Sequence, residues 1–124
     1  LHLIHPLGFQ TDAARVKRAG LDYWEHVDIR EHKNWDEFLK SEQPESVFLL
    51  SKKATKPFSQ VRFEPGAYLV LGSETQGLPD SLTDQYPEGY LQIPMRTHLV
   101  RSLNLAQAAA VVLYEALRQN DYPI

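Results

Sequence analysis

Apolar and polar residues follow one another in blocks that indicate strands and helices in turn. Nearly continuous apolar runs at 46–51 and 67–72 are typical of parallel strands covered on both faces. The short apolar run 1–4, the aromatic and β-branched segment 23–29, and the segment 90–95 are further strand candidates.

Helical patterns separate these strands. Residues 11–20 begin at a capping residue and stop at Gly20, and residues 34–43 open on an Asn cap followed by acidic residues. Residues 80–86 fit a brief helix. The segment 102–120 is Ala-rich and apolar around most of its circumference, which is typical of a helix buried in a core or against a second subunit. The alternation predicts an α/β fold with a mainly parallel sheet.

Composition narrows the class of protein. The 124 residues are 43% hydrophobic and 23% charged, which indicates one globular domain spanning 1–124. No apolar run approaches the ~20 residues that span a bilayer, and we expect a cytoplasmic protein with no membrane partner. Cysteine is absent, so disulfides and thiolate metal sites are excluded. The net charge of −3 disfavours a nucleic-acid partner unless basic residues gather locally or two subunits combine theirs.

The loop after the run 67–72 reads Gly-Ser-Glu-Thr-Gln-Gly and matches neither a P-loop nor a dinucleotide fingerprint. Gly72 and Gly77 permit positive φ angles and close backbone approach, and Glu74 lies between them. Ligands of open α/β sheets bind beyond the carboxyl ends of strands, where this loop falls. A tight turn with a solvated Glu74 is the alternative.

A second candidate segment joins the strand 90–95 to the last helix. Its polar loop contains Arg96, His98 and Arg101, and Ser102 is a plausible N-cap with Asn104 in the first turn. By itself Ser102 is expected only to cap, Asn104 to be a surface residue, and His98 to be a loop histidine. The spacing of His, Asp and Glu gives no metal motif, and we expect no metal site.

Basic residues form two groups. One consists of Arg15, Lys17 and Arg18, and the other of Lys52, Lys53 and Lys56. A solvated charged face is the default interpretation of both, and a phosphate-contacting patch needs independent support for a nucleic-acid role.

Together these segments resemble a known family. The stretches LVLGSETQGLP, LQIPM and VRSLNLAQAAAVVLYEALRQ, in this order, resemble motifs 2 and 3 of the SpoU-type RNA 2′-O-ribose methyltransferases of the SPOUT (α/β-knot) superfamily. LHLIHPLGF, KRAGLDYWEHVDI and VFLLSKKATKPF make the chain most similar to the small tRNA (cytidine/uridine-34) 2′-O-methyltransferases, which modify the wobble nucleotide.

The resemblance implies a C-terminal trefoil knot that holds S-adenosylmethionine mainly through main-chain groups. The implied contacts come from loops at 50–52, 72–77 and 93–103. The cofactor-binding residues carried over from the family are Leu50, Gly72, Gly77, Ile93, Ser102 and Leu103.

The resemblance also implies roles around the reacting centre and at the surface. Glu74, Ser102 and Asn104 occupy positions that the family uses near the transferred methyl group. For binding the tRNA anticodon stem-loop the candidates are Arg15, Lys17, Arg18 and Arg101. Tyr114 and the apolar face of the last helix match the family's homodimer contact.

The chain departs from the family at its front. Family members use an Arg of motif 1 near the reaction, in a segment resembling NTGNIIR that this chain lacks. We expect that the N-terminal strand and helix carrying motif 1 are missing, so that the chain binds cofactor but transfers methyl weakly or not at all. The rival hypotheses are a non-catalytic RNA-binding or dimerisation module with a vestigial pocket, and a generic doubly wound small-molecule binder.

Overall fold

The computed structural model describes residues 1–5, 26–73, 76–96 and 103–124. The chain divides into two compact units, residues 1–43 and 44–124, and each is an α/β arrangement in its own right. Every strand pair in the described sheets is parallel, as the sequence predicts. Among the described residues, no helix has the length and apolar character needed to cross a membrane.

The first unit pairs β1 (His2–Ile4) with β2 (Arg30–His32) and adds the helix α2 (Trp35–Glu42). The side chain of Asn34 caps α2 by accepting a hydrogen bond from the backbone N–H of Glu37, which confirms the predicted Asn cap. Phe38 is the residue of α2 that is buried. Its ring packs edge-on against two imidazoles of the strands, so this unit is held by aromatic and polar contacts.

The second unit contains a four-stranded sheet in the order β4-β6-β3-β5. Its strands are β3 (Val47–Leu50), β4 (Lys56–Pro57), β5 (Tyr68–Leu71) and β6 (Tyr90–Gln92). The central strand β3 carries the apolar run 47–50 and is largely buried, as expected for a strand between two neighbours. The sheet therefore brings the carboxyl ends of β3, β5 and β6 to one edge.

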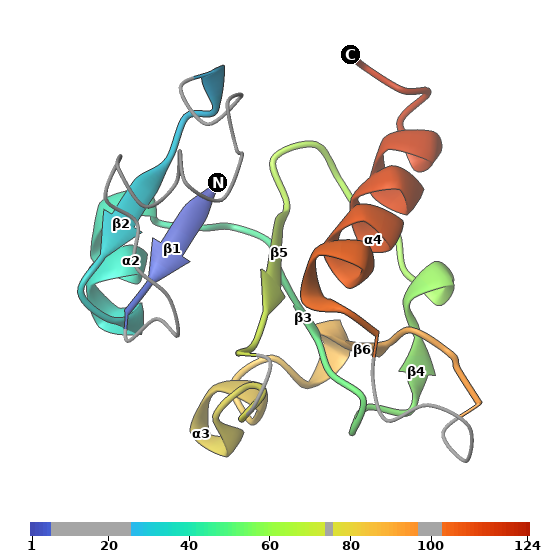
Figure 1. The fold of residues 1–124 in the computed structure, drawn as a ribbon, viewed down its shortest axis with the longest axis horizontal. Helices are drawn as coiled ribbons and strands as arrows, with labels where there is room; N and C mark the ends of the chain where they lie inside the picture. Colours follow the sequence, from blue (N-terminus) through green and yellow to red (C-terminus); the bar gives the residue numbers. More distant parts are fainter. Residues whose placement is uncertain (6–25, 74–75, 97–102) are drawn as a thin grey trace. The chain divides into compact units, whose positions relative to one another are not determined.

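One long helix and several short ones complete this unit. The long helix α4 (Leu105–Gln119) lies beside β5 (Figure 1) and sends Val112 into the core. The short ones are α3 (Asp80–Thr83) and the 3₁₀ turns η2 (Phe58–Gln60) and η3 (Pro87–Gly89). Leu50, Phe63, Leu91 and Val112 form the buried cluster that joins sheet and helix.

A hydrogen-bonded network fixes the carboxyl end of α4. The Gln119 side chain accepts from the backbone N–H of Phe63 at 2.8 Å and donates to the carbonyl of Val61 at 2.9 Å. Arg118 donates to Glu115 at 2.7 and 3.1 Å, and these hydrogen bonds hold the pKa of the Glu115 carboxyl below its ordinary value. The network ties the last turn of α4 to Val61 and Phe63, which follow η2 in the chain.

Two sequence predictions are wrong in detail. The strand predicted at 23–29 is not seen in its described part, 26–29, and the strand instead covers Arg30–His32. Packing places the described strand at Arg30–His32, because His32 is buried and its ring packs against Phe38 of α2. The last helix begins at Leu105 and not at 102, since Asn104 provides its N-cap. The predicted helix 11–20 lies outside the described residues.

Candidate functional site

Three strand ends create the site. Leu50 pairs with Leu71 on one side and with Leu91 on the other, so the chain leaves β3, β5 and β6 at the same level. Beyond β3, the backbone N–H of Ser51 donates to the Leu91 carbonyl at 2.9 Å. The Ser51 hydroxyl in turn accepts from the backbone N–H of Lys53 and shapes the turn that follows.

The loop after β5 folds back on itself. The backbone N–H of Gly77 donates to the Ser73 carbonyl at 3.0 Å, and Ser73 and Gly77 form an isolated bridge. Gly77 has φ +67°, and a Cβ added at Gly72 would lie 2.2 Å from the carbonyl carbon of Gly77. Both glycines are therefore required by the backbone path, Gly77 for its positive φ and Gly72 for close approach.

The amino end of α4 lines the site together with the three strand ends. The Asn104 side-chain oxygen accepts from the backbone N–H groups of Ala106 and Gln107 at 2.9 and 3.3 Å. Asn104 is thus the cap that the sequence assigned to Ser102, and its amide group is held in a fixed orientation at the site. The Asx cap satisfies two N–H groups that a helix start leaves without partners.

These segments line a cavity of about 730 Å³. That volume is within the range of about 300–1,000 Å³ typical of small-molecule and cofactor sites. Polar backbone from the turns and apolar side chains from the strands and α4 both line it. Among the predicted site residues, those that line the cavity are Leu50, Gly72, Gly77, Ile93, Leu103 and Asn104.

Several predicted site residues are not placed. Glu74, Ser102 and Arg101 lie outside the described residues, as do Arg15, Lys17 and Arg18. Tyr114 does not line the cavity, and its side chain is 57% exposed on α4. Val111 and Leu113 are also exposed on this helix, at 42% and 48%. Together they form an outer apolar surface of α4, whereas Val112 points into the core.

The cavity is also lined by residues for which the sequence predicts no cofactor contact. Lys53, Leu78, Met95 and Ala108 all line it. Ala108 follows Asn104 by four positions, and this helical spacing is the one signal that could have found it. The sequence favours a solvated basic face for Lys53, whereas the turn after β3 brings this residue to the cavity.

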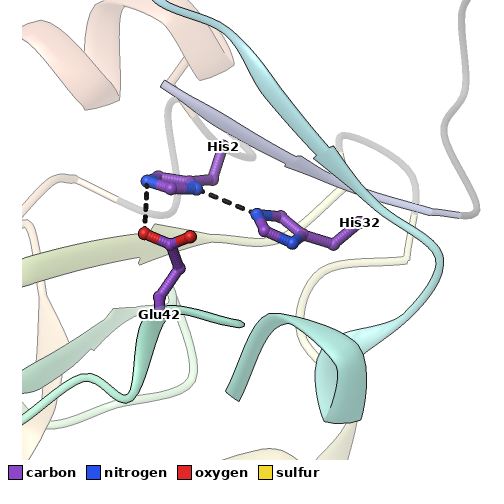
Figure 2. Close-up of side chains that lie close together, drawn as sticks. All are labelled: His2, His32 and Glu42. Atoms are coloured by element: carbon purple, nitrogen blue, oxygen red, sulfur yellow. Dashed lines mark hydrogen bonds and ion pairs between the residues drawn. The ribbon is translucent and has the colours of Figure 1, made fainter. Parts of the chain in front are cut away.

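The first unit contains a separate polar cluster. His2, His32 and Glu42 approach one another there, with His2 between the other two side chains (Figure 2). Burial lowers the pKa of the His2 imidazole below its ordinary value, and the Glu42 carboxylate acts in the opposite direction. The ring of His2 stacks on that of His32 with centroids 5.2 Å apart.

Comparison with known proteins gives consistent matches over nearly the whole chain. The SpoU rRNA Methylase family matches residues 1–114. A tRNA (cytidine(34)-2′-O)-methyltransferase of Escherichia coli K12 is 45% identical over 124 residues, covering 99% of this chain and 78% of that enzyme. An enzyme of the same name from Saccharophagus degradans is 48% identical, covering 96% of this chain and 77% of the relative.

A solved structure supports the same relationship. It concerns the 2-OH methylation of C/U34 on tRNA and superposes with a TM-score of 0.87 at 44% identity. The alignment covers 98% of this chain and 78% of that one. The similarity therefore includes both units and every segment that lines the cavity.

Proposed function

Because the chain belongs to the SpoU rRNA methylase family, we propose that it methylates the ribose 2′-hydroxyl of the wobble nucleotide, cytidine or uridine 34, of tRNA. The methyl donor is S-adenosylmethionine. The observation that carries the proposal is the cavity at the common edge of β3, β5 and β6, in a chain 45% identical to a named tRNA (cytidine(34)-2′-O)-methyltransferase.

The residues present fit this cofactor. S-adenosylmethionine carries no phosphate, which agrees with a site that has neither a P-loop nor a dinucleotide fingerprint. Leu50, Ile93 and Leu103 offer apolar surface, and the turn from Gly72 to Gly77 offers backbone groups without bulky side chains. When bound, the cofactor supplies a methyl group on a positively charged sulfur.

The protein's part in the reaction is alignment and proton transfer. A ribose hydroxyl is a weak nucleophile, so a group must accept its proton as the oxygen–methyl bond forms and the sulfur–methyl bond breaks. Asn104 has its amide fixed at the cavity by the helix cap and is suited to orient the ribose. Glu74 and Ser102 are proposed, by their positions in the family's motifs, to act beside Asn104 near the transferred methyl group.

Lysines at the cavity rim are suited to contact the RNA backbone. Lys52 and Lys53 are both exposed and both line the cavity. Cations beside a site where RNA must enter favour phosphate and contribute a salt-dependent part of the affinity. We assign them this role beside Arg15, Lys17, Arg18 and Arg101, the positions implied by the family.

The outer apolar surface of α4, formed by Val111, Leu113 and Tyr114, is proposed as the contact with a second copy of the chain. An exposed apolar helix face is costly in water and is typical of an interface. A homodimer would also allow basic residues of two subunits to form a local patch, although each chain carries a net charge of −3. We also propose that the chain forms the family's trefoil knot and that it acts in the cytoplasm, where tRNA is found.

The test is methyl incorporation from radiolabelled S-adenosylmethionine into tRNA, with the modified nucleotide located by mass spectrometry of nuclease fragments. For residues 1–124 alone we expect at most weak incorporation at position 34, and full incorporation when a segment carrying motif 1 is joined to the front of the chain. Neither protein should incorporate methyl into tRNA already methylated at that position. The double variant Lys52→Ala, Lys53→Ala is expected to raise KM for tRNA several-fold with S-adenosylmethionine affinity unchanged, and Lys40→Ala serves as the matched control.

Calorimetry separates the rival functions. Binding of S-adenosylmethionine and of tRNA without methyl transfer would identify a non-catalytic RNA-binding module. No binding of S-adenosylmethionine at all would leave a generic small-molecule site and contradict the proposal.

A further inference from the structure

Three elements of the first unit each contribute one potential metal ligand. His2 comes from β1, His32 from β2 and Glu42 from the last turn of α2. His2 Nδ1 lies 2.9 Å from His32 Nε2, and His2 Nε2 lies 3.9 Å from Glu42 Oε1. One ligand atom from each residue can be chosen so that all three lie within 4.8 Å of one another (Figure 2).

The local structure explains why these side chains meet. Paired residues of parallel strands project to the same face, so the register His2↔Arg30 and Ile4↔His32 puts both imidazoles on the side facing α2. Phe38 and Glu42 are four residues apart on α2 and therefore share a face. The Phe38 ring contacts both imidazoles with centroids 5.5 and 5.3 Å away, which limits their rotation.

We propose that His2, His32 and Glu42 bind a divalent transition-metal ion of the Zn²⁺ class. Two imidazoles and a carboxylate are a donor set that Zn²⁺ accepts, whereas Mg²⁺ and Ca²⁺ prefer oxygen alone. The site is sheltered, because His32 is 8% exposed and the Glu42 side chain 10%. Such an ion would join β1, β2 and α2, the three elements described in this unit.

Metal binding requires side-chain rotation, because an ion takes only one nitrogen of an imidazole, whereas His2 turns Nδ1 toward His32 and Nε2 toward Glu42. Ligand atoms about 2.0–2.1 Å from a tetrahedral zinc lie roughly 3.3 Å apart, against 2.9 Å between the two imidazole nitrogens and a limit of 4.8 Å within the set of three ligand atoms. When the metal takes the place of the proton between these nitrogens, that proton moves to the other ring nitrogen of the same histidine, so both imidazoles bind as neutral ligands. Arg30, which pairs with Glu42 at 3.3 Å, has a side chain 56% exposed and is free to turn outward.

The same strands provide a matched control on their opposite face. His5 lies 3.4 Å from Glu31, and both side chains are more than 40% exposed. This pair has the same chemistry, an imidazole and a carboxylate, but belongs to no three-residue cluster among the described residues. A surface histidine that binds metal non-specifically would behave like His5.

The experiment titrates the untagged full chain with Co²⁺, followed by visible absorption, and with Zn²⁺, followed by calorimetry and thermal unfolding. We expect one equivalent bound, an intense visible band of Co²⁺ in a four-coordinate site, and a rise in Tm with Zn²⁺. His32→Gln and His2→Gln are expected to weaken binding at least tenfold, whereas His5→Gln leaves it unchanged.

Clear results would overturn the inference. It is wrong if the unmodified chain shows no saturable Co²⁺ or Zn²⁺ binding, a measurement that does not depend on any variant folding. It is equally wrong if His2→Gln and His32→Gln, folded by circular dichroism, bind as the unmodified chain does. Neither readout depends on methyl transfer, so the inference stands or fails apart from the proposed function.

Discussion

Each compact unit is stabilised internally by a different kind of contact. In residues 44–124 the buried cluster is entirely apolar and joins a four-stranded sheet to α4. In the described part of residues 1–43 a two-stranded sheet meets α2 through Phe38, and the side chains around Phe38 are two imidazoles and an indole. The apolar cluster of the larger unit stabilises the sheet whose edge forms the cavity. The smaller unit is stabilised by contacts between polar and aromatic side chains.

Removing the central aromatic ring of each unit tests this difference most strongly. Phe63 and Phe38 are 0% and 1% exposed, and each change to Ala is expected to lower the free energy of unfolding by about 3–5 kcal/mol. Phe63→Ala should also abolish S-adenosylmethionine binding, because Phe63 belongs to the same buried cluster as Leu50, which lines the cavity. Urea unfolding measures the stability of both variants, and calorimetry below the Tm measures S-adenosylmethionine binding. If folded Phe38→Ala also fails to bind S-adenosylmethionine, the expectation that binding depends on the second unit alone is wrong.

A methyl group on Gly72 tests the cavity loop itself. The Cβ of Gly72→Ala would lie 2.2 Å from the carbonyl carbon of Gly77, so the turn must open. We expect S-adenosylmethionine affinity to fall at least about tenfold, or roughly 1.4 kcal/mol. Gly66→Ala is the control, since Gly66 has φ +87° and open space around it. It should lose stability by roughly 1–2 kcal/mol yet retain affinity.

The cap of α4 is expected to contribute less. Asn104→Ala removes the acceptor for two backbone N–H groups and should lower the free energy of unfolding by about 0.5–2 kcal/mol. Asn104→Asp should restore stability, because aspartate caps equally well. If the amide orients the ribose, the aspartate variant will still have a reduced kcat; full activity in Asn104→Asp would limit Asn104 to capping.

The smallest effect concerns the far end of the same helix. Hydrogen bonds from Arg118 and Gln119 lower the pKa of Glu115 below its ordinary value of 4.5. A carboxyl with a lowered pKa in the folded state contributes stability above pH 4.5, and this contribution disappears as the pH falls. Glu115→Gln should therefore be less stable than the unmodified chain near neutral pH, with the difference shrinking in acid. Urea midpoints from pH 7 to pH 3 test this, with exposed Glu88→Gln as control.

The site could be predicted only in part. The apolar runs gave β3 and β5 closely, and glycine spacing identified the turn from Gly72 to Gly77 because a doubling backbone requires residues without side chains. The helix cap was placed on Ser102 when Asn104 performs it, since Ser and Asn are both good caps and local sequence does not choose between them. Lys53 was assigned to solvent because its distance from the cavity depends on the turn after β3.

The sequence by itself determined the class of fold, the parallel strands and the family, since periodicity and motif order are local properties of the chain. Only the tertiary structure decided which distant residues meet. His2, His32 and Glu42 are separated by 30 and 10 positions and form no metal motif along the chain, yet strand register and the turn of α2 bring them together. Side-chain chemistry is written in the sequence, but distances between side chains follow from how sheets and helices pack.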